Sequence, residues 1–192
     1  MQTRKQFLSI FSALLAFIVV GSSANAADAK TNATEVVKPV TNAPTVRILA
    51  GLLEPLKDEA GVTWAAADGF DDGDTKDRPD TEITNTKTPS IYRAERFGMT
   101  KFTQKLPNGK YTVNLHFAVT YEGISEAGQC VMTINVEGTV LKDFDVWNKA
   151  GGARKAHVES IPVTIADGKL DITFAQEGTS STLSAIEIVP AP

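Results

Sequence analysis

Short runs in which apolar and polar residues alternate are the feature that most constrains the fold of this chain. Successive side chains of an extended strand point to opposite faces, so alternation indicates a strand that is buried on one side. Eight such runs are separated by turn sequences rich in glycine, proline, asparagine and aspartate. They span residues 46–50, 101–106, 110–118, 129–138, 139–146, 159–165, 169–175 and 183–189.

These runs predict an all-β domain, and in particular a two-sheet antiparallel β-sandwich of the jelly-roll type. No stretch after residue 26 shows sustained helical periodicity, and no internal repeat is present. In the run at 110–118, alternate residues from Tyr111 to Phe117 are expected to face the core. His116 and Asn114 fall on the opposite face and are expected to be exposed.

The first 26 residues have the organisation of a secretory signal peptide. Two basic residues, Arg4 and Lys5, precede an apolar stretch at 7–20, and the small-x-small sequence Ala24-Asn25-Ala26 follows it. We therefore predict that the protein is exported and is secreted or periplasmic.

The rest of the chain divides into a linker and one domain. Residues 27–44 contain no aromatic residue, are rich in Ala, Thr, Asn and Pro, and predict a flexible linker. Residues 45–192 are then a single domain of ordinary size.

Charge and cysteine content restrict the partners and the means of stabilisation. The formal net charge is −4, and both charged residues in 1–26 are basic, so export leaves a more acidic protein. An acidic protein is poorly suited to nucleic acid or an anionic membrane. No later stretch approaches the roughly 20 apolar residues of a membrane-spanning helix. Cys130 is the only cysteine, so we expect it to be a small buried hydrophobe.

Motifs for common catalytic sites are missing from the sequence. It contains no nucleophile elbow, no phosphate-binding P-loop and no His-Glu-x-x-His motif. Zinc-dependent and serine-triad catalysis are therefore not expected. Glycoside hydrolysis stays open, because it requires only two suitably spaced carboxylates.

An aspartate-rich loop between residues 68 and 80 includes Asp72 and Asp74. Calcium takes about six to eight oxygen ligands, so a structural calcium ion is one interpretation of this loop. The EF-hand spacing is not met, because Lys76 stands where an acid or amide is required. A solvated loop and direct contact with a ligand are the alternatives, and no other cofactor is expected.

Several aromatic residues lie at predicted strand ends or in loops, outside the alternating runs. Sugars stack their C–H faces on such rings, while carboxylates and amides bind the hydroxyl groups. Anchoring of loops is the alternative role for each ring. The residues are Trp64, Phe70, Tyr92, Phe97, Tyr121 and Trp147.

Seven segments carry a resemblance to a known family. They are RILAG, ADGFDDGDT, PSIYRAERFG, NGKYTVNLHFAVTYEG, VEGTVLKDFDVWNKAGGARKA, VTIADGKLDITF and LSAIEIVP. In this order they resemble the malectin and malectin-like carbohydrate-binding domains over essentially all of 45–192. The resemblance implies a β-sandwich lectin whose sugar site lies in loops at one rim, formed by aromatic rings and a carboxylate.

The resemblance also implies particular site residues. The ring after the Glu-Arg pair is Phe97, where malectin has tyrosine, and the aromatic pair after strand 110–118 becomes Tyr121 and Glu122. Tyr92 matches the family pattern as a site or framework residue. The early-loop tyrosine of malectin corresponds to the region that includes Asp72 and Asp74.

The family pattern also bears on the segment 178–181 and on the pair Glu95 and Arg96. The aspartate that malectin carries near its last strand corresponds to 178–181, which contain no acid. Glu95 also matches the family pattern. It either pairs with Arg96 at the base of a loop, as part of the framework, or Arg96 reaches into the pocket.

The sequence leaves three functions in order of preference. The first is a secreted, non-catalytic carbohydrate-binding protein whose partner is an oligosaccharide or polysaccharide. The second is a protein-interaction or surface-attachment module that acts with an enzyme or surface protein and binds no sugar. An autonomous glycosidase is the third.

Overall fold

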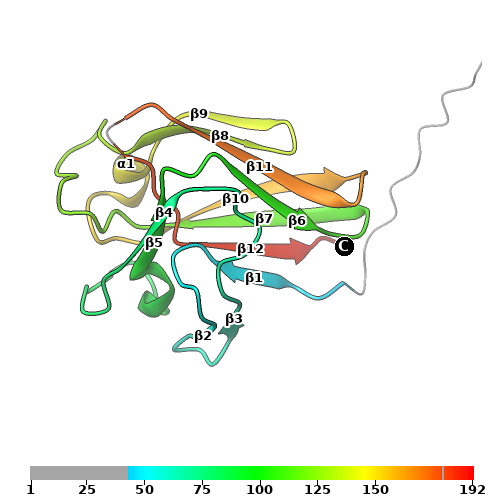
Figure 1. Cartoon of the computed structure of the whole chain (residues 1–192), viewed down its shortest axis with the longest axis horizontal. Coiled ribbons are helices and arrows are strands. Elements are labelled where there is room, and N and C mark those ends of the chain that lie inside the picture. The colour runs from blue at the N-terminus through cyan, green and yellow to red at the C-terminus, as the bar shows by residue number, and fades with distance from the viewer. Residues whose placement is uncertain (1–42, 179) are drawn as a thin grey trace, which may run out of the picture. The chain divides into compact units, whose positions relative to one another are not determined.

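The computed structural model describes residues 43–178 and 180–192. The predicted signal peptide and all of the predicted linker except its last two residues lie outside the described residues. Figure 1 shows the described chain as two layers of β-strands with a smaller group of short strands beside them.

The first layer is a four-stranded sheet in which every neighbouring pair is antiparallel. Its long central strand supplies the alternating residues that the sequence predicted to face the core. In spatial order the strands are β1 (Val46–Leu49), β12 (Ala185–Pro190), β7 (Gly109–Phe117) and β10 (His157–Ile165).

The second layer is also a four-stranded antiparallel sheet. In spatial order its strands are β6 (Lys101–Lys105), β11 (Lys169–Gln176), β8 (Val131–Val136) and β9 (Thr139–Asp145). The eight strands of the two sheets are the eight predicted from alternation, and their order is that of a jelly roll. The prediction of an all-β sandwich is confirmed.

The inner faces of the two sheets form the main core. Phe117 of β7 and Phe144 of β9 meet across the layers with ring centroids 5.1 Å apart, and both are buried. Each such side chain contributes roughly 1.5 to 3 kcal/mol of burial free energy. Cys130 belongs to the same core, and burial raises the pKa of its thiol to about 12, in agreement with the expected buried hydrophobe.

Short elements occupy stretches that show no alternation. Two small antiparallel ribbons and two short helices follow the predicted loops rather than the predicted strands. They are β2 (Leu56–Lys57), β3 (Thr63–Trp64), β4 (Asp74–Asp77), η1 (Pro89–Tyr92), β5 (Ala94–Phe97) and α1 (Val146–Ala150). No helix among the described residues is long and apolar enough to cross a membrane.

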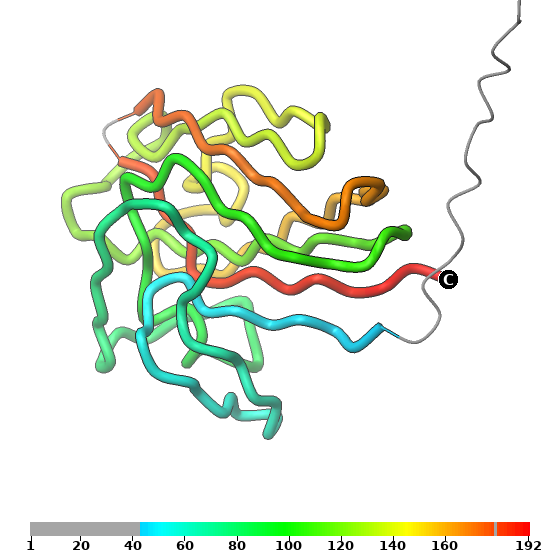
Figure 2. The backbone as a smooth tube through the Cα atoms, turned by 45° about the vertical axis from the view of Figure 1, so that its right-hand side comes forward, coloured from blue at the N-terminus to red at the C-terminus, as the bar shows by residue number. Residues whose placement is uncertain are grey.

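The prediction that His116 is exposed is wrong. His116 is only 8% exposed, its Nδ1 lies 2.8 Å from the Tyr92 hydroxyl oxygen, and the Trp64 ring meets it edge-on at 5.3 Å. The cause is the segment between β1 and β6, which Figure 2 shows gathered beside β1 and which adds a second apolar cluster there. That cluster covers the end of a sheet face that the strand pattern alone leaves open to solvent.

Gly51 lies where the chain leaves β1 and passes against β5. A Cβ atom at this position would lie 2.6 Å from the carbonyl carbon of Ala94 and would also collide with the backbone nitrogen of Glu95. Gly51→Ala should therefore lower the free energy of unfolding by about 2 kcal/mol, as overpacking does. Urea denaturation measures this loss.

Gly138→Ala is the control for this substitution. Gly138 has a φ of 84°, and no atom lies within 4 Å of the position that a Cβ would take. Only the backbone strain of about 1 kcal/mol is therefore expected. Equal losses in the two variants would show that the approach of Gly51 to β5 is not tightly constrained.

Candidate functional site

A cavity of about 510 Å³ opens between the β4–β5 ribbon, the loop after β7 and the segment before β12. It brings together residues from three parts of the chain that are distant in sequence. They are Lys76, Arg78, Glu95, Phe97, Tyr121 and Ser180.

The register of the β4–β5 ribbon determines which side chains face the cavity. Asp74 pairs with Phe97, and Lys76 pairs with Glu95. Directly opposed residues of an antiparallel pair lie on the same face, so these four side chains share one face of the ribbon. Arg96 is on the other face.

Arg96 holds the ribbon in place instead of entering the cavity. Its guanidinium donates to the carbonyl oxygens of Ala50, Asp72 and Gly73 at 3.0, 2.9 and 2.8 Å. It also lies 4.6 Å from the centre of the Phe70 ring, a cation–π contact. Arg96 therefore has a framework role, but the expected pair with Glu95 is not formed, because Glu95 is paired with Arg78.

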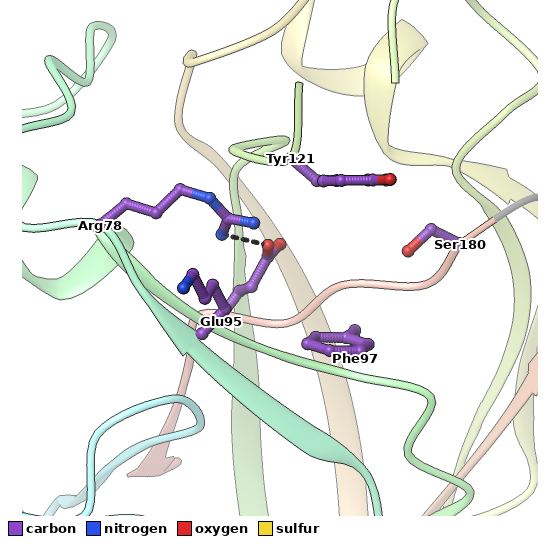
Figure 3. A pocket seen from close by; sticks show the side chains of 6 residues that line it. Arg78, Glu95, Phe97, Tyr121 and Ser180 are labelled. Atoms are coloured by element: carbon purple, nitrogen blue, oxygen red, sulfur yellow. Dashed lines mark hydrogen bonds and ion pairs between the residues drawn. The ribbon is translucent and has the colours of Figure 1, made fainter. Parts of the chain in front are cut away.

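Two aromatic rings form opposite walls of the cavity. Figure 3 shows the Tyr121 ring on one side and the Phe97 ring on the other, with the space between them open. The Tyr121 side chain packs on Gly123, where a Cβ would lie 2.5 Å from the ring carbons. Tyr121 is still 50% exposed, so a large part of its ring is available for contact.

An ion pair closes one end of the cavity. Arg78 Nη1 donates to Glu95 Oε1 at 2.5 Å and to the Thr120 hydroxyl at 3.0 Å, and the Thr182 hydroxyl donates to Glu95 Oε2 at 2.6 Å. Glu95 is 3% exposed. Both of its carboxylate oxygens therefore accept hydrogen bonds from within the protein. Ser180 lies at the opposite end of the cavity (Figure 3).

Tyr92 and Asp72 use their polar atoms within the fold. Tyr92 is 2% exposed and bonded to His116, and burial raises the pKa of its phenol to about 12. The Asp72 carboxylate accepts hydrogen bonds from the Thr100 hydroxyl at 2.5 Å and from the Thr100 backbone N–H at 2.6 Å, which lower its pKa. Neither residue lines the cavity.

Glu122 and Asp74 lie at the margins of the cavity between Tyr121 and Phe97. The Glu122 carboxylate accepts from Arg154 at 3.2 Å and, with Tyr121, lines a neighbouring cavity of about 420 Å³ that also includes Trp147. Asp74 is on the cavity face of the ribbon beside Phe97 but is not among the lining residues.

A metal site is not apparent in the part of the chain that the structure describes. Within 43–178 and 180–192, no three His, Cys, Asp or Glu side chains are arranged to hold an ion. In the aspartate-rich loop, the Asp72 carboxylate accepts hydrogen bonds from Thr100, and two backbone carbonyl oxygens accept hydrogen bonds from Arg96.

Some lining residues were not singled out by sequence reasoning. Lys76 and Arg78 lie in a stretch without apolar alternation, so nothing in the local pattern indicates which way they point. Ser180 lies in the segment 178–181, where malectin has its aspartate. The correspondence of this segment to a site residue of the family could have identified Ser180 as a lining residue.

The fold and the site together define a jelly-roll β-sandwich domain with an aromatic-walled cavity at one rim. The family model for the malectin domain matches residues 45–189, and the chain belongs to this family. Malectin-B of Xenopus laevis is 34% identical over 93 residues, which cover 46% of this chain and 33% of that protein.

Other similar proteins are larger. A probable leucine-rich repeat receptor-like serine/threonine-protein kinase of Arabidopsis thaliana is 32% identical over 120 residues, which cover 58% of this chain and 12% of the kinase. The crystal structure of a Bacteroides uniformis beta-glucuronidase superposes with a TM-score of 0.69 at 17% identity and covers 78% of this chain and 18% of the enzyme. The chain thus matches a third or less of the length of each of these proteins.

Proposed function

We propose that this protein is a non-catalytic carbohydrate-binding protein and that the cavity between Tyr121 and Phe97 is its binding site. The observation that carries the proposal is the pair of rings on opposite walls. Each ring offers a flat apolar face to the C–H surface of a sugar, and the polar residues at the two ends are placed to bind hydroxyl groups. Carbohydrate binding is also what the malectin resemblance implies.

The acidic groups at the cavity support binding without catalysis. Glycosidases use a pair of carboxylates about 5 to 10 Å apart. Among the described residues that line the cavity, Glu95 is the only acid, and Arg78 and Thr182 occupy its two oxygens. A carboxylate held in this way is poorly suited to donate a proton or to attack a sugar.

The features of residues 1–26 support export as part of the same proposal. A secreted or periplasmic protein would meet its oligosaccharide or polysaccharide outside the cytoplasm, alone or beside an enzyme or surface protein.

Removing either ring should weaken sugar binding. After a glycan array identifies a ligand for the unmodified protein, Tyr121→Ala and Phe97→Ala should each reduce its affinity by about 1 to 3 kcal/mol, as loss of a buried anchor does. Isothermal titration calorimetry measures the affinity. Tyr121→Phe keeps the ring and should retain most of the binding.

Leu53→Ala is the control, because Leu53 is 69% exposed and is not among the residues that line the cavity. If the ring variants melt several degrees lower but bind the glycan as well as the unmodified protein does, the rings are loop anchors and the site is elsewhere. If the unmodified protein binds no glycan, the proposal fails and a protein partner becomes the better interpretation.

A further inference from the structure

We propose that the sugar bound in this cavity carries an acidic group, either a uronic acid carboxylate or a sulfate ester, and that Lys76 is the residue that selects it. This inference rests on the function proposed above and assigns the class of sugar to the same site.

Lys76 is a cation without a counterion. It lines the cavity, and its exposed side chain makes no hydrogen bond or ion pair with any of the described residues. The second cation, Arg78, makes its two side-chain hydrogen bonds through Nη1 alone. Its Nη2 group has no partner within residues 43–178 and 180–192 and is available as a donor.

The acidic residues nearby do not neutralise Lys76. Glu95 is paired with Arg78 and accepts from Thr182, so its charge is balanced by the other cation of the cavity. Asp74 shares the ribbon face with Lys76, but no ion pair joins the two side chains.

Glu122, the remaining acid close to Tyr121, is paired with Arg154 at 3.2 Å. The lining of the cavity therefore carries one positive charge in excess, although the whole chain has a formal net charge of −4.

An acidic sugar matches this arrangement. Its ring stacks between Phe97 and Tyr121, and its anionic oxygens accept from the Lys76 ammonium group and from Arg78. Charge-assisted hydrogen bonds of this kind are roughly twice as strong as neutral ones. Carboxylates and sulfate esters both present such oxygens. The cations of the cavity favour a negatively charged sugar, and the experiment distinguishes a carboxylate from a sulfate ester.

Binding of matched ligands to the full mature protein tests this inference. The probes are an oligouronide, its methyl ester, a sulfated oligosaccharide and the unsulfated form of the same oligosaccharide. At low ionic strength at least one acidic probe should bind about tenfold more tightly than its neutral partner. The preference should shrink in about 0.5 M NaCl, because salt screens an exposed cation.

Lys76→Gln should abolish this preference, whereas Lys76→Arg should keep it. Lys142→Gln is the matched control, since Lys142 is an exposed lysine of β9 that does not line the cavity. If the protein binds neutral sugars as well as acidic ones, the inference is overturned while the proposed function stands. If it binds neither class of sugar, both fail.

Discussion

Lowering the pH from 7.5 to 4.5 should destabilise the domain by about 2.5 kcal/mol through His116 alone. Burial lowers the pKa of His116 from 6.5 to about 4, and the charge of Glu187 opposes this only in part. The unfolded chain therefore takes up a proton below about pH 6.5, while the folded domain does so only near pH 4. The contribution of neutral His116 to the free energy of unfolding is fully present above the unfolded pKa of 6.5. It is lost as the pH falls from there towards the folded pKa of about 4.

Urea denaturation at several pH values checks this expectation. His116→Gln removes the titrating group, so the difference in pH dependence between the two proteins isolates its contribution. The carboxyl groups whose pKa values are lowered, Asp58 and Asp171 among them, have ordinary values of 3.8 and contribute at lower pH. Equal slopes for the two proteins between pH 6.5 and 4.5 would mean that His116 becomes protonated inside the folded domain.

Glu95→Ala should lower the free energy of unfolding by about 3 kcal/mol. Removing one partner of a buried ion pair leaves the other charge without compensation, which costs about 3 to 5 kcal/mol in buried sites. The Arg78 side chain is 21% exposed, so water offsets part of this cost. The buried Thr182 hydroxyl loses its acceptor as well.

Chemical denaturation of Glu95→Ala and Glu122→Ala gives a direct comparison. Glu122 also belongs to an ion pair, but its side chain is 81% exposed, and exposed pairs contribute little. Glu122→Ala should therefore match the unmodified protein. Similar stabilities for both variants would contradict a structural role for the Arg78–Glu95 pair.

The strands of the sandwich could be predicted from the sequence because the information is local. In β7 and β8 every second residue is apolar, and this period of two is set by backbone geometry alone. β4 shows the opposite case. All four of its residues are exposed, so it has no apolar face, and only its pairing with β5 reveals it as a strand.

The candidate site was predictable only in part for the same reason. Phe97 and Tyr121 were found by their positions in the family pattern, and the structure places them on facing walls. Lys76 and Glu95 become neighbours through a pairing between strands separated by η1 and its flanking loops. The bond between Tyr92 and His116 depends on how that whole segment folds back on β7, which no local pattern encodes.

The position of the chain ends has a practical consequence for the cavity. Val46 of β1 pairs with Ile188, and the N–H of Ala191 donates to the carbonyl oxygen of Lys110 at the start of β7. Both ends of the described chain therefore lie beside the first residues of β7 (Figure 1), whereas Tyr121 belongs to the loop that follows its last residue, Phe117. Nine residues of strand, roughly 3.3 Å each, separate them. A solid support or a fused protein attached at residue 43 or at Pro192, the two ends of the described chain, would face away from the cavity and leave its mouth open to large polymers.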